Sequence, residues 1–203
     1  MMKRFVYGFA AAAAFFPMSW AQAQISYSFL ESTLTVNEVD TSFGEDERGI
    51  GVDLRGSYEI MPILQVFGRI RAADFDDIDL QTTLIEAGVG THYDFSDTKS
   101  VFLNVSVLTT DLDIDVPGLG TFSGDDDGYG VSVGYREINH TPMEFRLSID
   151  HVTLNDSDTS ETTMDIALMY RLTQRLKLFG GFQFGGDEGI FRAGVRYYLG
   201  NDN

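Results

Sequence analysis

The stretch Phe191-Arg192-Ala193-Gly194-Val195-Arg196-Tyr197-Tyr198-Leu199 decides the fold of this chain. Its apolar side chains come at every second position, and the residues between them are arginine, glycine and tyrosine. Successive side chains of a β-strand point to opposite faces, so this period of two predicts a strand with one apolar and one polar face. The stretch is also about as long as a tilted strand that crosses a bilayer, which takes ~9–11 residues.

The same alternation recurs along the chain in runs of about ten residues, whereas strands of soluble proteins cluster near five or six. We count about ten such runs, near 25–36, 48–60, 63–73, 80–95, 100–111, 128–138, 143–154, 162–172, 176–185 and 189–199. No segment after residue 23 approaches the ~20 consecutive apolar residues of a membrane helix. The sequence therefore predicts an all-β fold, a transmembrane antiparallel up-and-down β-barrel of about ten strands, with eight as the alternative count.

The first residues have the layout of an export signal. Lys3 and Arg4 are followed by an apolar run over 5–16 and by the small-residue sequence Ala21-Gln22-Ala23. This pattern predicts a signal peptide over 1–23, cleaved after Ala23, and a barrel domain over 24–203. A single membrane anchor is the alternative, but the apolar run is short for one. Export and a barrel together predict the outer membrane of a Gram-negative bacterium. The chain has no cysteine, which excludes a disulfide framework and thiol chemistry.

The predicted connections alternate between short turns and acidic loops. The acidic set, at 37–47, 74–79, 111–127, 155–161 and 186–189, holds 20 acidic residues and no Lys or Arg. Bacterial barrels have short periplasmic turns and longer external loops, so we expect the acids outside the cell. The formal net charge of −17 argues against nucleic acid as a partner, because phosphates need a basic surface.

Five tyrosines stand near the ends of the strands expected to run toward the periplasm: Tyr58, Tyr93, Tyr135, Tyr170 and Tyr197. Tyrosine gathers at membrane interfaces, so the series predicts the inner aromatic girdle of a barrel. Chance enrichment of tyrosine in strands is the alternative explanation.

The alternation also predicts which charged side chains face the lumen. The acids are Glu31, Asp53, Glu59, Glu86, Glu144, Asp150 and Asp165, and the bases are Arg55, Arg69, Arg71, Arg136, Arg146, Arg171, Lys177, Arg192 and Arg196. The interior of a small barrel is nearly filled by its own side chains, and buried charges without partners are costly. We therefore expect a paired, hydrogen-bonded plug, with a narrow ion path as the alternative.

The ending from Arg192 to Leu199 resembles the C-terminal assembly signal of outer-membrane barrels. The segments Leu54-Arg55-Gly56-Ser57-Tyr58 and Gly88-Val89-Gly90-Thr91-His92-Tyr93 are similar to those of the small OmpX/OmpA-type barrel superfamily, often labelled porin-like. The chain departs from that pattern by continuing through Gly200-Asn201-Asp202-Asn203. The resemblance implies outer-membrane lipid, lipopolysaccharide and the barrel-assembly machinery as partners, but it implies no single function.

Two motifs could carry catalysis. Gly130-Val131-Ser132-Val133-Gly134 matches the G-x-S-x-G pattern of serine hydrolases, which works only on a tight strand-to-helix turn. Here the pattern falls within a predicted strand, so we expect Ser132 and its glycines to be small lumen residues. Asp150 and His151 are adjacent on a strand and should point to opposite faces. His92 and His140 have no metal-site spacing to His151 or to each other. We therefore expect no catalytic residues and no bound cofactor.

The run Gly124-Asp125-Asp126-Asp127-Gly128 is the best candidate for a metal site. Carboxylate oxygens bind calcium and magnesium, but the run lacks the spaced ligand order of a recognisable calcium loop. Solvated, mutually repelling loops are the first interpretation, and weak divalent binding at Asp125, Asp126 and Asp127 that bridges to anionic lipopolysaccharide is the alternative. For the whole protein, the sequence favours a non-enzymatic barrel with a structural, adhesion or envelope-protection role. A small porin or ion channel, and an outer-membrane hydrolase or acyltransferase, are the alternatives.

Overall fold

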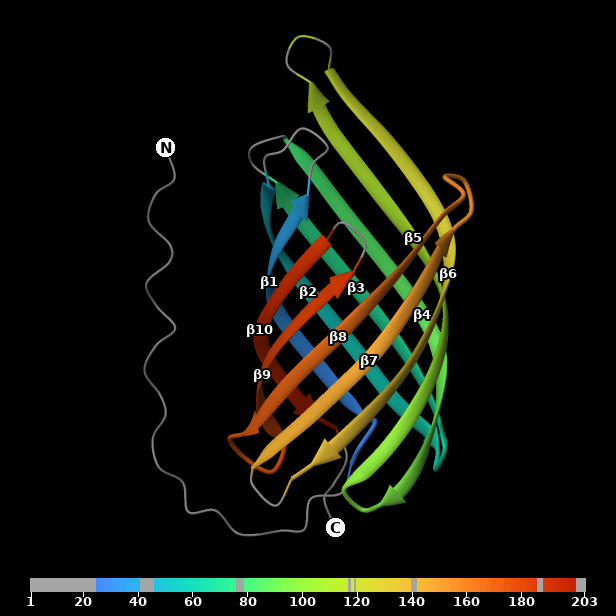
Figure 1. Ribbon diagram of the computed structural model, residues 1–203, viewed down its shortest axis with the longest axis vertical. Helices are drawn as coiled ribbons and strands as arrows, with labels where there is room; N and C mark the ends of the chain where they lie inside the picture. The colour runs from blue at the N-terminus through green and yellow to red at the C-terminus, as the bar shows by residue number, and fades with distance from the viewer. Residues whose placement is uncertain are drawn as a thin grey trace.

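The computed structural model describes residues 25–40, 46–75, 79–116, 118, 120–139, 142–185 and 188–199, and these form one closed barrel of ten antiparallel strands (Figure 1). The strands are β1 (Phe29–Asp40), β2 (Asp46–Met61), β3 (Leu64–Phe75), β4 (Leu80–Ser96), β5 (Lys99–Val116), β6 (Gly120–Ile138), β7 (Met143–Leu154), β8 (Thr159–Arg171), β9 (Leu176–Gly185) and β10 (Glu188–Tyr198). Each strand pairs with its sequence neighbours, and β1 pairs with β10 to close the sheet. Among these residues no helix is long and apolar enough to cross a membrane.

The predicted architecture and the strand count of ten are confirmed, and the alternative count of eight is wrong. The predicted signal peptide lies outside the described residues and stays a prediction.

The predicted loop over 111–127 is wrong, because β5 continues to Val116 and β6 begins at Gly120. The alternation of apolar and acidic residues continues in the acidic part of the hairpin. Ile114 is the register partner of Phe122, and Leu112 is that of Gly124. Asp111, at the alternate position, is the register partner of Asp125. Asp111, Asp113, Asp125 and Asp127 occupy one face of a hairpin that still has strand periodicity, and Asp126 lies on the other face. Likewise, β1 continues to Asp40 and β2 begins at Asp46, inside the loop predicted over 37–47.

Polar side chains face the lumen and apolar side chains face outward, as the alternation predicted. Along β1, Glu31, Thr33 and Thr35 are buried, whereas Leu30 and Leu34 are exposed. Such an arrangement suits a barrel whose outer surface lies in hydrocarbon, since lipid tails accept apolar side chains and the lumen accepts polar ones.

The two ends of the barrel differ. The turns between β2 and β3, β4 and β5, β6 and β7, and β8 and β9 all lie at the lower end in Figure 1. The β5–β6 hairpin extends farthest at the opposite, upper end (Figure 1). The five girdle tyrosines lie on the outward-facing positions of their strands, toward the lower end. In bacterial barrels the end with the short turns is the one that faces the periplasm.

Glycines on the inner face of β6 make room for large side chains from its neighbour. A Cβ atom on Gly134 would lie 2.3 Å from Cζ of Phe102 and 2.6 Å from the Leu147 carbonyl oxygen. Gly180 on β9, in contrast, has nothing within 4 Å of its Cβ position. Gly134 is therefore required by packing, and Ser132 and its two glycines are small lumen residues, as expected.

Candidate functional site

The candidate site is the lumen, whose lower part is filled by one continuous layer of side chains. We call this the floor layer; it comprises Tyr27, His92, Phe102, Arg136, Glu144, Lys177 and Tyr198. These residues come from the segment before β1 and from β4, β5, β6, β7, β9 and β10, so the layer reaches across the barrel.

Contacts join the aromatic half of the floor layer to its charged half. The Tyr27 ring stacks on His92 with centroids 4.0 Å apart, and it meets Phe102 edge-on at 6.5 Å. The Arg136 guanidinium lies 4.5 Å from the centre of the Tyr27 ring and donates to Oε1 of Glu144 at 2.6 Å. A cation over an aromatic ring is attracted by the negative charge of the ring's face. Arg136 therefore contacts both the aromatic half of the floor layer, through Tyr27, and the charged half, through Glu144.

Glu144 is the centre of the charged half. Its Oε2 accepts hydrogen bonds from Lys177 Nζ at 2.5 Å and from Tyr198 OH at 3.0 Å. Glu144 is 1% exposed, and such a buried carboxylate is tolerated only when its oxygens are fully used. On the β2–β5 side, Gln65 donates to Asn104 Oδ1 at 3.0 Å. The lower lumen is therefore packed with side chains.

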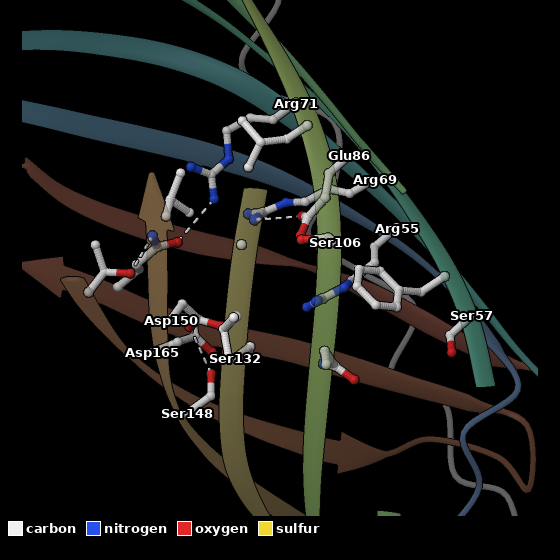
Figure 2. Close-up of a pocket in the computed structure, with 18 of the residues that line it drawn as sticks. Arg55, Ser57, Arg69, Arg71, Glu86, Ser106, Ser132, Ser148, Asp150 and Asp165 are labelled. Carbon is white, nitrogen blue, oxygen red and sulfur yellow. Dashed lines mark hydrogen bonds and ion pairs between the residues drawn. The ribbon is translucent and has the colours of Figure 1, made fainter. Parts of the chain in front are cut away.

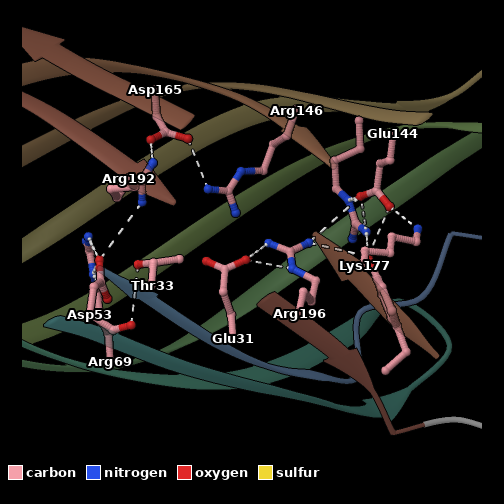
Figure 3. A network of polar contacts seen from close by, with 12 residues as sticks. Glu31, Thr33, Asp53, Arg69, Glu144, Arg146, Asp165, Lys177, Arg192 and Arg196 are labelled. Atoms are coloured by element: carbon pink, nitrogen blue, oxygen red, sulfur yellow. Dashed lines mark hydrogen bonds and ion pairs between the residues drawn. The ribbon is translucent and has the colours of Figure 1, made fainter. Parts of the chain in front are cut away.

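A second group of charges lies above the floor layer, and we call it the middle network (Figure 3). Its members are Asp53, Arg69, Arg71, Arg146, Asp165 and Arg192. Arg69 forms a bidentate pair with Asp53, with Nη2–Oδ2 at 2.6 Å and Nε–Oδ1 at 3.0 Å. Arg146 donates to Asp165 at 3.0 Å, and Arg192 pairs with the same carboxylate. Planar arginine–carboxylate pairs of this kind are strong and directional.

Arg196 forms a further buried ion pair next to the floor layer. Its Nε donates to Glu31 Oε2 at 2.7 Å, and its Nη1 lies 3.8 Å from Glu144 Oε1. The predicted paired, hydrogen-bonded plug is thus confirmed for most of the charges that were expected to face inward. Phe29 and Phe179 add apolar surface between the charges, since Arg196 lies over both rings at 4.0 and 6.0 Å.

A cavity of about 220 Å³ lies beside the middle network. Arg55, Arg69 and Arg71 line one side of it, and Ser132, Ser148 and Asp150 line the other (Figure 2). Its lining continues from Tyr27 in the floor layer to Leu154 and Glu161 near the upper end. The cavity is therefore a polar pocket above a packed floor.

The sequence matches the outer membrane protein beta-barrel domain family over residues 8–171. The chain belongs to that family. No curated protein matches the chain in sequence.

Among solved structures, Neisserial surface protein A (NspA) is 14% identical, with 86% of this chain and 98% of that chain covered and a TM-score of 0.51. The beta domain of the Bordetella autotransporter BrkA is 12% identical, with 85% and 99% covered and a TM-score of 0.51. Ail, the attachment invasion locus protein of Yersinia pestis, is 13% identical, with 85% and 99% covered and a TM-score of 0.47. At such identities the likeness concerns the fold alone.

The residues considered for catalysis do not converge in this barrel. Ser132 lies on the inner face of β6 opposite Asp150 of β7, and Asp150 accepts a hydrogen bond from Ser148 at 3.0 Å. His151 is on the outer face of β7, where its Nδ1 is 2.9 Å from Thr162 Oγ1. His92 belongs to the floor layer, and His140 lies outside the described residues. Ser132, Asp150 and His151 thus form no hydrogen-bonded triad.

The candidate metal ligands also separate. Asp125 and Asp127 point outward from β6, whereas Asp126 points to the other face. Asp126 accepts the backbone N–H groups of Asp156 at 2.9 Å and Ser157 at 3.0 Å, which lie in the β7–β8 turn. In the described part of the chain, no three His, Asp or Glu side chains are placed to hold one metal ion. Divalent binding at Asp125, Asp126 and Asp127 stays a prediction, and the geometry favours sites that do not combine all three.

Sequence reasoning missed the aromatic members of the lumen. Tyr27, Phe29, Phe102 and Phe179 are buried, and all four face inward. The signal was present for two of them, because Phe29 has the strand parity of Glu31 in β1 and Phe179 has that of Lys177 in β9. An apolar residue on a polar face is easily taken as an interruption of the pattern, although a cation such as Arg136 needs an aromatic face to lie on.

Proposed function

We propose that this protein is a non-enzymatic outer-membrane barrel without a wide pore. It acts through the upper end of the barrel, outside the cell, in adhesion or envelope protection. The observation that carries this proposal is the floor layer, in which side chains from seven segments contact one another across the lower lumen. Water and ions need a continuous polar path to cross a barrel. The stacked pair Tyr27–His92 and the ion pairs around Glu144 lie across the lower lumen, where such a path would run.

The upper end supplies the surface for this role. Residues 120–127 of β6 extend past the end of β7, whose last residue, Leu154, pairs with Gly128. The outer face of this hairpin carries Asp111, Asp113, Asp125 and Asp127, so it presents negative charge far from the barrel wall. A projecting, strongly charged hairpin is suited to contact with molecules outside the cell.

A small porin is the rival function. The observation that favours a porin is the cavity, which is lined by polar groups from Tyr27 to Glu161. Single-channel recording in a planar bilayer separates the two. The refolded wild-type protein should give no steady conductance. Tyr27→Ala combined with His92→Ala should give conductance, since it removes the stacked half of the floor layer. Ser157→Ala, in an upper turn, is the matched control and should behave as wild type. Steady, sizeable conductance of the wild-type protein would refute the proposal.

A further inference from the structure

Arg55 is a lumen arginine that the ion-pair network does not use. It lies on the inner face of β2, between the buried residues Asp53 and Ser57. Its guanidinium is 5.7 Å from the centre of the Phe67 ring. Among the residues that the structure describes, Arg55 makes no hydrogen bond and no ion pair.

The carboxylates near Arg55 are engaged elsewhere. Asp53 is held by Arg69 and Arg71, Glu31 is held by Arg196, and Glu86 lies 4.0 Å from Arg69 Nη1. The charges of Arg146 and Arg69 repel Arg55 most strongly, and those of Glu86 and Glu31 attract it less. Since no carboxylate forms an ion pair with Arg55, its guanidinium lacks a direct counterion, which is unfavourable in a lumen largely shielded from water.

The position of Arg55 makes it accessible from the cavity. Arg55 is only partly buried, and because it faces the lumen its remaining exposed surface lies in the cavity that it lines. In Figure 2 its guanidinium projects into this space toward Ser132 and Asp150, with Arg69 above it. The hydroxyl group of Ser106 also lines the cavity and can donate a hydrogen bond.

We propose that this cavity binds a small free oxyanion, a sulfate, phosphate or carboxylate group, on Arg55. A guanidinium offers two parallel N–H donors that fit two oxygens of such a group, and the anion would supply the missing counter-charge. The volume of about 220 Å³ accommodates a small oxyanion with some of its water. Because the floor layer lies below the cavity, the ligand would enter from the upper end and bind without crossing the barrel.

Sulfate is the probe for this site. The refolded full chain in a non-ionic detergent, which contains no phosphate headgroup, is titrated with sodium sulfate at an ionic strength kept constant with sodium chloride. Calorimetry and thermal unfolding should show saturable binding with a rise in Tm. Arg55→Gln should weaken that binding at least about tenfold, the value of one charge-assisted pair. Arg55→Lys keeps the charge and should bind at an intermediate strength.

Two readouts distinguish this role from a structural one. Without sulfate, Arg55→Gln should be as stable as wild type or more stable, because it removes an unpaired charge. Arg48→Gln is the matched control on β2: Arg48 is exposed and pairs with Glu38, so this variant should bind sulfate as wild type does. The proposal is overturned if sulfate acts no differently from chloride on the wild-type protein. It is equally overturned if Arg55→Gln binds sulfate with undiminished strength.

Discussion

Glu31 and Arg196 are direct partners across the seam where the barrel closes. They are register partners in the pairing of β1 with β10, and Arg196 Nε lies 2.7 Å from Glu31 Oε2. Residues 165 positions apart in the chain are thus joined by backbone pairing and by a buried ion pair. The lumen charges therefore help to define which strands meet at closure.

Removing one partner of this pair should destabilise the barrel. Glu31→Gln leaves Arg196, which is 0% exposed, with only the longer contact to Glu144 as a charge partner. The expected loss is about 3–5 kcal/mol in the free energy of unfolding, measured by urea unfolding in detergent. Breaking the exposed pair Arg48–Glu38 by Glu38→Gln should cost only about 0–1 kcal/mol. Equal losses for the two variants would contradict the burial argument.

A side chain at Gly134 should be poorly tolerated. Gly134→Ala places a methyl group against the Phe102 ring and the Leu147 carbonyl, so we expect a loss of about 1–3 kcal/mol. Gly180→Ala meets nothing within 4 Å and serves as the control, with a change near zero or a slight gain. The comparison is made by unfolding under identical conditions. A neutral Gly134→Ala would show that Phe102 can move away at little cost.

Asp126 should make the upper end sensitive to acid. The backbone N–H groups of Asp156 and Ser157 donate to its carboxylate and hold the pKa of Asp126 below its ordinary value. A carboxyl group with a lowered folded pKa stabilises the fold above its unfolded pKa of about 3.9, and that stability is lost as the pH falls. Between about pH 5 and pH 3, the free energy of unfolding should therefore fall less in Asp126→Asn than in the wild-type protein. Identical pH profiles would refute the role of Asp126.

Divalent cations should stabilise the upper end. Asp111 and Asp125 are cross-strand partners on the outer face of the hairpin, and like charges placed opposite each other repel. We expect millimolar calcium or magnesium to raise Tm more than sodium at matched ionic strength, by mass action on weak carboxylate sites. Asp125→Asn with Asp127→Asn should reduce this difference, whereas Asp126→Asn should leave most of it. If calcium and sodium act alike, screening alone accounts for the response.

The sequence predicted the wall of this barrel better than its ends. Period-two alternation reports on each strand separately, so β7 and β9 were predicted with the bounds that the structure has. The extension of β5 and β6 was missed because runs of aspartate are typical of loops, although Leu112 and Phe122 keep the alternation. Which lumen charges face inward follows from parity. Which of them pair does not, since Asp53 lies directly opposite Arg71 but forms its bidentate pair with Arg69, the register partner of Arg55.

The most direct test of this account is the labelling of single cysteines in intact cells with a membrane-impermeant thiol reagent. The chain has no cysteine, so each introduced thiol is the only one present. Ser157→Cys lies in the β7–β8 turn at the upper end, and Ser96→Cys lies beside the β4–β5 turn at the lower end; both positions are exposed. A closed barrel with its lower end in the periplasm predicts labelling of Ser157→Cys in intact cells and of Ser96→Cys only after the outer membrane is permeabilised. Labelling of Ser96→Cys in intact cells would contradict the account.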